Sequence, residues 1–354
     1  MLQVPAELFG LSAEPVLLVK NGRTVYANKA AEQLFGPGCG SASLRSLLGA
    51  ELAELQPPSC IVETTLHGGR CLVRVQSMEG LRLYLFRAAE SAPQEINEAF
   101  RYALRSSLME LNVSRSLLQD RAELLKDETL LAPLSSLNRS FFRLNRMIAN
   151  LSVIQNAAVG ALVFHPVPLD LCPFLRDLAD SVSVLFPAPE LQLRLPETLK
   201  ATADPALLET LLLNLLSNAI LHAQGCTRVC LSLHAARDQL ILSVDDDGCG
   251  IPPAELQHVF DRYRHGFALS AMANGAGFGL TAVREIAHVH GGTLLLESRE
   301  GCGTAVRVSM SRLLSVSDPV LDAAGPVYER SYNSILTGLA DCLPPSAFNG
   351  TFLS

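Results

Sequence analysis

The most apolar stretch of the chain is DPALLETLLLNLLSNAILHA, residues 204–223, in which leucines cover most of the circumference of a predicted helix. Asp204 is placed to cap this helix, Pro205 suits its first position, and Gly225 ends it. Four polar residues recur every fourth position, on one face: Thr210, Asn214, Asn218 and His222. A buried amide without a partner costs about 1–3 kcal/mol. The amides therefore either satisfy each other and nearby backbone, or face a cavity that holds something polar.

Apolar residues also recur at helical spacing over residues 95–126 and 130–157. In the second stretch the predicted apolar stripe consists of Leu134, Leu137, Phe141, Leu144, Ile148, Leu151 and Ile154. The short connection between the stretches predicts an antiparallel helical hairpin over residues 93–160. A lone hairpin would leave an apolar stripe uncovered, so we expect a second copy of the chain to complete a four-helix bundle.

Residues 1–90 alternate between apolar and polar positions, as strands do. The stretch PVLLVKNGRTVYANKAAEQLFG predicts two strands joined by a tight turn at Asn21-Gly22, then a helix from about Asn28. Three strand-like runs follow: CIVETTL, RCLVRVQ and LRLYLFR. This order resembles a PAS sensor domain of the α/β type, and YANKAAEQLFG is similar to the most recognisable part of that family. The resemblance implies a module that senses a ligand or partner; the alternative is a packing or dimerisation domain without a ligand.

Residues 162–313 combine helices with hairpins. A helix is predicted near residues 171–185, and VCLSLHAARDQLILSVDDDGCGIP predicts a hairpin that ends in an acidic, glycine-rich turn. GAGFGLTAVREIAHVHGG predicts a glycine-rich turn that leads into a helix, and TLLLESREGCGTAVRVSM a last hairpin. Backbone amides at the start of such a helix bind phosphate, and an aspartate in the acidic turn can accept a hydrogen bond from an exocyclic amine.

Four boxes stand in order in this region: NLLSNA, DDDGCGIP, VFDRYR and GAGFGL. The set resembles the ATP-binding domain of histidine kinases, gyrases and mismatch-repair ATPases, a two-layer α/β sandwich. The resemblance implies that Asn218 is a ligand of Mg²⁺ between the phosphates of ATP, with Asn214 beside it, and that Asp246 recognises the adenine amine. The other residues implied are His222 at the phosphates, Gly248 and Gly250 at the base, Phe260 before the lid, and Gly275, Gly277 and Gly279 around the triphosphate.

LNRSFFRLNRMIANLSVIQNAAVG resembles the second helix of the histidine-kinase dimerisation domain. The family's His-Glu-Leu-Arg-Thr-Pro-Leu box then aligns with residues 102–108, where Tyr102 stands at the position of the phospho-accepting histidine. No histidine occurs between His67 and His165. A phenol has a pKa of about 10, so only about one part in a thousand is ionised at pH 7. Tyr102 is therefore either a packing residue of the bundle or an unusual phospho-acceptor.

Composition narrows the class of protein. With 354 residues, 49% of them hydrophobic and 18% charged, the chain predicts a multidomain globular protein. The net charge of −7 and the lack of a Lys/Arg cluster argue against nucleic-acid binding. We expect no membrane insertion and a cytoplasmic location, because no bilayer-spanning apolar run or signal-peptide pattern is found. The nine cysteines show no C-x-x-C pair and predict free thiols.

The predicted architecture is a multidomain α+β protein with a sensor domain at 1–90, a dimerisation hairpin at 93–160, an ATP-binding domain at 162–313 and a tail at 314–354. The tail has one amphipathic stretch near residues 332–343, which either docks on the ATP-binding domain or a partner, or is partly disordered.

The resemblance implies a homodimeric protein of two-component signalling that works with a response regulator or a partner kinase. Tyr102 favours a degenerate kinase that acts as an ATP-responsive regulator. The first alternative is an active kinase that phosphorylates Tyr102 or a partner. The second is an ATP hydrolase or mechanical clamp, disfavoured because Asn214 stands where those relatives carry a catalytic glutamate.

Overall fold

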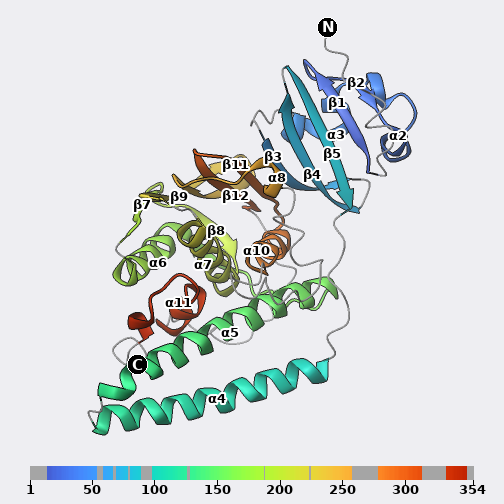
Figure 1. The fold of residues 1–354 in the computed structure, drawn as a ribbon. Coiled ribbons are helices and arrows are strands. Elements are labelled where there is room, and N and C mark those ends of the chain that lie inside the picture. Colours follow the sequence, from blue (N-terminus) through green and yellow to red (C-terminus); the bar gives the residue numbers. More distant parts are fainter. Residues whose placement is uncertain are drawn as a thin grey trace.

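The computed structural model describes residues 14–53, 59–66, 69–78, 80–88, 98–125, 128–186, 188–222, 225–256, 278–312 and 332–348. Figure 1 shows N-terminal strands with small helices beside them, the long helices of the middle of the chain, and C-terminal strands covered by helices. None of the helices within these ranges combines the length and the apolar character needed to cross a membrane. All nine cysteines are free thiols, as predicted.

The N-terminal part has the predicted order of elements. Asn21 and Gly22 both have positive φ, which suits the tight turn expected there. Asn28 caps the first helix, because its Oδ1 accepts hydrogen bonds from the backbone N–H groups of Ala31 and Val16, both at 2.9 Å. The elements are β1 (Val16–Lys20), β2 (Arg23–Ala27), α2 (Lys29–Phe35), η1 (Cys39–Ser41), α3 (Leu44–Ala53), β3 (Ser59–Leu66), β4 (Gly69–Met78) and β5 (Leu81–Ala88).

Two helices of 28 residues each form the middle, α4 (Glu98–Leu125) and α5 (Leu131–Ala158), with η2 (Glu128–Leu130) between them. They lie side by side in Figure 1 and share buried polar contacts. Arg115 Nη1 donates to Asn138 Oδ1 at 3.2 Å, and Asn138 Nδ2 donates to Gln119 Oε1 at 3.3 Å.

The buried stripe of α5 differs from the stripe expected from its leucines. Leu137 and Leu144 are exposed, at 41% and 38%, while every fourth residue from Leu134 to Ile154 is buried. That buried stripe consists of Leu134, Asn138, Phe142, Arg146, Asn150 and Ile154. The reason is that α5 is covered by other parts of the same chain, which offer polar partners to a polar stripe.

In the C-terminal part, helices cover one face of a sheet (Figure 1). The helices predicted near residues 171–185 and 204–223, both hairpins and the helix after the glycine-rich turn are all present. The elements are β6 (Val167–Asp170), α6 (Leu171–Leu185), β7 (Glu190–Arg194), β8 (Lys200–Ala203), α7 (Pro205–His222), β9 (Arg228–Ala236), β10 (Gln239–Asp246), α8 (Pro253–Leu256), α10 (Phe278–Val289), β11 (Leu294–Arg299) and β12 (Gly303–Ser311), and then, in the tail, α11 (Tyr332–Gly338) and η3 (Pro345–Phe348).

One sheet runs through both ends of the chain. Its strand order is β2-β1-β5-β4-β3-β11-β12-β10-β9-β7, so the N-terminal sheet continues into the C-terminal one where β3 pairs antiparallel with β11. The register places Leu295 opposite Val62 and Leu296 opposite Ile61. The sequence pattern did not predict this junction, because each strand pattern is equally compatible with an edge strand.

His290 links the end of α10 to the start of α7. Its Nδ1 lies 2.8 Å from the carbonyl oxygen of Ile286, and its Nε2 lies 3.1 Å from the backbone nitrogen of Asp204. The backbone N–H of Asp204 can donate only to an unprotonated Nε2, so the ring is neutral with its proton on Nδ1. Burial lowers the pKa of His290 from its ordinary value of 6.5, against smaller raising effects of Ile286 and Asp204.

This lowered pKa predicts a loss of stability in mild acid. The unfolded chain takes up a proton on this ring below about pH 6.5 and the folded chain does not, so the free energy of unfolding falls as pH falls through that value. We expect the midpoint of thermal unfolding to decrease from about pH 7.5 to about pH 5.5, and to decrease less in His290→Gln. His288→Gln, at an exposed position of the same helix, is the control and should keep the wild-type pH dependence. Equal pH dependence in all three proteins would contradict this assignment.

Candidate functional site

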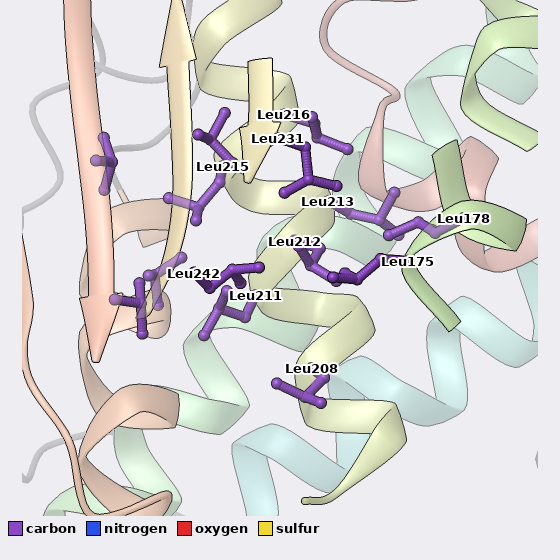
Figure 2. Close-up of a cluster of buried hydrophobic side chains, with 14 of the residues drawn as sticks. Leu175, Leu178, Leu208, Leu211, Leu212, Leu213, Leu215, Leu216, Leu231 and Leu242 are labelled. Atoms are coloured by element: carbon purple, nitrogen blue, oxygen red, sulfur yellow. The ribbon is translucent and has the colours of Figure 1, made fainter. Parts of the chain in front are cut away.

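The helix α7 is oriented by its apolar faces. Asp204 caps it, since its Oδ1 accepts from the backbone N–H groups of Ala206 and Leu207 at 3.0 and 3.1 Å. Figure 2 shows the leucines of α7 among those of the strands on one side and of α6 on the other. The labelled α7 members are Leu208, Leu211, Leu212, Leu213, Leu215 and Leu216, all buried. This apolar packing fixes the direction in which the polar stripe of Thr210, Asn214 and Asn218 points.

Asn214 is satisfied by protein, which is the first of the two possibilities stated for these amides. Its predicted place beside Asn218 at the phosphates of ATP stays a prediction. Its side chain exchanges two hydrogen bonds with Asn150 of α5, at 2.8 and 2.9 Å, and its Oδ1 also accepts from Arg146 Nη2 at 3.0 Å. Its Nδ2 donates to the carbonyl oxygen of Thr210 at 3.0 Å. The physical reason is that α5 covers this part of α7 and brings an amide and a guanidinium of matching geometry.

Asn218 lies one turn further along α7 in a different environment. Its side chain is half-buried, and it makes no side-chain hydrogen bond within the part of the chain that the structure describes. Neither amide atom of Asn218 is a buried atom without a partner, so solvent or a ligand can reach the side chain. Asn218 is therefore the member of the stripe that fits a ligand. The helical position of His222 agrees with the prediction, and its side chain lies outside the described residues.

The acidic turn after β10 holds Asp246 by backbone hydrogen bonds. Its Oδ1 accepts from the N–H of Gly248 at 3.0 Å and from the N–H of Thr304 at 3.3 Å. Burial raises the pKa of this carboxyl, and the two backbone hydrogen bonds act against that rise. Both bonds use Oδ1 and neither uses Oδ2, and the predicted role of Asp246 at the adenine amine stays a prediction.

Asp247, the next residue, supports the turn from outside. It accepts hydrogen bonds from the hydroxyl and the N–H of Thr227 and from the N–H of Arg228, at 2.6 to 3.0 Å. The bond from the Thr227 hydroxyl is the largest cause of its pKa lying well below the ordinary range.

The two glycines of the acidic turn differ in what they approach. Gly250 has a φ of +67°, and a Cβ there would lie 2.1 Å from the carbonyl oxygen of Arg299. A glycine is therefore required at 250 by a close contact with protein backbone, and its predicted role at the base stays a prediction. Gly248 is buried beside Asp246, and its predicted role at the base stays a prediction.

Gly279 brings the start of α10 to the polar stripe. A Cβ at this position would lie 3.1 Å from Asn214 Oδ1, so a glycine allows the two helices to approach closely here. Phe260, Gly275 and Gly277 lie outside the described residues, and their predicted roles stay predictions. Tyr102 lies in α4, and its side chain is likewise outside the described part.

Sequence reasoning missed two partners of Asn214 and one residue that holds the first of them. Arg146 and Asn150 are the α5 partners, and Asp341 of the tail forms an ion pair with Arg146 at 2.6 Å. The signal was available for α5: Asn138, Arg146 and Asn150 follow the same four-residue spacing that singled out the stripe on α7. For Asp341 no such signal exists, because its partners lie about 195 residues away in sequence.

Comparison with protein families gives a match in the N-terminal part of the chain and another in the C-terminal part. Residues 203–313 match the family described as histidine kinase-, DNA gyrase B-, and HSP90-like ATPase, and residues 6–69 match the PAS domain. The expectation of a PAS domain and of an ATPase domain of this family is confirmed. The replacement of an acceptor histidine by Tyr102 is not tested by these matches and stays a prediction.

Individual relatives are similar over part of their length. The signal transduction histidine-protein kinase AfsQ2 of Streptomyces coelicolor is 30% identical over 52% of this chain and 33% of its own. The sensor-type histidine kinase PrrB of Mycobacterium leprae is 35% identical over 44% of this chain and 34% of its own. This chain thus covers about a third of the length of these curated relatives. The crystal structure of the ATP-binding domain of PrrB from Mycobacterium tuberculosis is 28% identical over 42% of this chain and 98% of that domain, with a TM-score of 0.35.

Proposed function

We propose that this protein, which carries a PAS domain and a histidine-kinase-type ATPase domain, is an ATP-binding sensor of two-component signalling that regulates a partner rather than phosphorylating itself on histidine. The observation that carries the proposal is the contrast between two amides on one helix face. Asn214 is saturated by α5, whereas Asn218 is half-buried and without a hydrogen bond in the described part of the chain.

The described residues fit Mg²⁺-ATP. An amide oxygen is a ligand that Mg²⁺ accepts, which suits Asn218. Asp246, held at Oδ1 by two backbone amides, presents a carboxylate to an adenine amine. The start of α10 at Phe278 and Gly279 supplies backbone N–H groups next to the same stripe, where a helix favours negative charge. When bound, the nucleotide would supply a transferable phosphoryl group.

Tyr102 is the reason to propose regulation instead of autophosphorylation on histidine. It lies in α4 at the position that aligns with the acceptor histidine, and Ala103 follows it where the family has an acidic residue. A neutral imidazole presents a nucleophilic nitrogen at pH 7, whereas a phenol with a pKa of about 10 is almost entirely un-ionised and is a weaker nucleophile. Ala103 has no group that could act as a general base.

We propose that the protein acts as a homodimer through α4 and the exposed leucines of α5. In the single chain, α4 exposes Val113, Leu117 and Leu124 at 60%, 63% and 73%, and Leu111 and Leu118 at 49% and 52%. A contiguous apolar surface of this kind is typical of an interface between chains. A response regulator or a partner kinase is the proposed recipient of the signal.

The nucleotide site predicts which variants lose ligand-induced stabilisation. A ligand at about 100 times its Kd raises the free energy of unfolding by about 2.7 kcal/mol. We expect Mg²⁺-ATP to raise the midpoint of thermal unfolding of the wild type, and this rise to be lost in Asn218→Ala and in Asp246→Asn, measured by scanning calorimetry. Asp246→Asn keeps an oxygen that can accept from Gly248 and Thr304, so its fold should remain. Asn145→Ala on α5 and the exposed Asp238→Asn are matched controls and should keep the full rise. If both site variants retain it, the site is misplaced.

The assignment of Tyr102 predicts the outcome of incubation with γ-³²P-labelled ATP and Mg²⁺. We expect no protein-bound label, because the phenol is un-ionised and lacks a base. Acid-labile label on the protein would overturn the regulatory proposal, since phosphohistidine is acid-labile. Acid-stable label that disappears in Tyr102→Phe would instead establish the alternative in which this tyrosine accepts the phosphoryl group.

The exposed leucines predict a dimer that one charge can weaken. We expect Leu117→Glu to shift the protein from dimer to monomer, because a carboxylate would be placed in an apolar interface, as measured by sedimentation equilibrium. Ser116→Glu, at an exposed neighbouring position on α4, is the control and should remain dimeric. A wild-type protein that is monomeric at tens of micromolar would refute the homodimer.

A further inference from the structure

The tail segment 332–348 occupies the angle between α5 and α7 (Figure 1). Its helix α11 packs against α5, α6 and α7, and η3 packs against α5. The apolar side chains of the segment belong to the same core as the leucines of α7, and six of them are almost fully buried: Ile335, Leu336, Leu339, Ala340, Leu343 and Phe348. The ring of Phe348 lies 5.6 Å from that of Phe142 on α5, centroid to centroid. The segment is therefore an integral part of the core and not a surface appendage.

Polar contacts fix this segment to α5 in particular. The two carboxylate oxygens of Asp341 take separate partners, Arg143 Nε at 2.7 Å and Arg146 Nη1 at 2.6 Å. Asn138 Nδ2 donates to the carbonyl oxygen of Phe348 at 2.9 Å. On the α7 side, Ser334 Oγ donates to Glu209 Oε1 at 2.8 Å. The tail thus joins α5, of the helix pair, to α7, of the ATPase domain.

Arg146 connects this anchor to the nucleotide site. Its Nη1 donates both to Asp341 and to Ser217 Oγ, at 2.8 Å, and its Nη2 donates to Asn214 Oδ1 at 3.0 Å. The guanidinium is buried, so without the carboxylate it would be an unpaired charge inside the protein. Asp341 therefore stabilises the arrangement in which Arg146 donates a hydrogen bond to Asn214.

We propose that residues 332–348 are an autoinhibitory clamp, which holds the ATPase domain on α5 with Asn214 capped by Arg146 and Asn150 and so withheld from a bound nucleotide. The inference rests on the proposed nucleotide site at Asn218 and Asp246, and extends that site to Asn214, the neighbouring amide of the same helix face. Nucleotide that engages Asn214 must break the hydrogen bonds from α5, and this weakens the hold of Arg146 on the tail. Tail docking and nucleotide binding therefore oppose each other, and the opposition is reciprocal.

Two substitutions loosen the clamp by different physical routes. Asp341→Asn removes the carboxylate charge and nearly preserves the side-chain volume, so it leaves Arg143 and Arg146 without their counter-charge. Gly338→Val changes no charge, but a Cβ at 338 would lie 2.6 Å from the Cβ and Cδ1 of Leu213, which forces α11 away from α7. Asp238→Asn serves as the control, because it makes the same acid-to-amide change as Asp341→Asn. Asp238 lies on an exposed turn at the opposite end of β10 from Asp246.

The test compares the full-length wild type with these three variants. Hydrogen exchange of the amides of Leu339 and Leu343, which donate to carbonyls inside the segment at 2.9 and 3.0 Å, reports whether the tail is docked. Isothermal titration with Mg²⁺-ATP gives the Kd. We expect faster exchange in Asp341→Asn and Gly338→Val, and a Kd lower than that of the wild type by about fivefold or more. We also expect saturating Mg²⁺-ATP to speed exchange of the same amides in the wild type.

The outcomes separate the clamp from the nucleotide site itself. Tight binding in the wild type, with an unchanged Kd in variants whose tail exchanges faster, would overturn the clamp and leave the nucleotide site standing. Unchanged exchange in both loosened variants would also overturn it, because Asp341 and Gly338 would then not hold the segment. Absence of binding in every protein, including those with a loosened tail, would overturn the nucleotide site and the clamp with it.

Discussion

The buried guanidinium of Arg146 is the interaction on which the arrangement of three segments depends. A charge at this depth is tolerated only with a counter-charge and hydrogen-bond acceptors, and removal of one partner of such a pair costs about 3–5 kcal/mol. Arg146 obtains the charge from Asp341 of the tail and the acceptors Ser217 and Asn214 from α7. These partners come from different parts of the chain. The contacts of this one side chain therefore hold the helix pair, the ATPase domain and the tail together.

The leucine sheath of α7 is the second constraint. Apolar side chains on most of its circumference pack against α6 and the sheet, as Figure 2 shows, so the helix cannot rotate to bury its polar face. The polar stripe is left where α5 and α10 approach. One amide of the stripe, Asn214, is hydrogen-bonded to protein. The next amide, Asn218, has no hydrogen-bond partner among the residues that the structure describes. The stripe thus divides into one amide that is paired with α5 and one amide to which we assign the proposed nucleotide.

The junction between β3 and β11 places the PAS domain in backbone contact with the ATPase domain. An edge strand presents unpaired N–H and C=O groups, and pairing with another edge satisfies them. Three residue pairs, from Cys60 to Val62 on β3, form the junction. Eight residue pairs join β3 to β4 on its other side. The pairing of β3 with β11 is therefore the less extensive of the two pairings of this strand.

Local pattern determined most of the secondary structure and the identity of the ATPase domain. The cap at Asp204, the turn at Asn21-Gly22 and the alternating strands act over a few residues, so they can be read along the chain. The stripe on α7 could be recognised as polar within an apolar helix, and its four-residue spacing is a property of the helix itself. What satisfies each amide could not be recognised, because the partners of Asn214 lie 64 and 68 residues away and are brought there only by the packing of α5. The role of Asp341 was likewise decided by tertiary structure, since a long-range ion pair leaves no periodic trace in sequence.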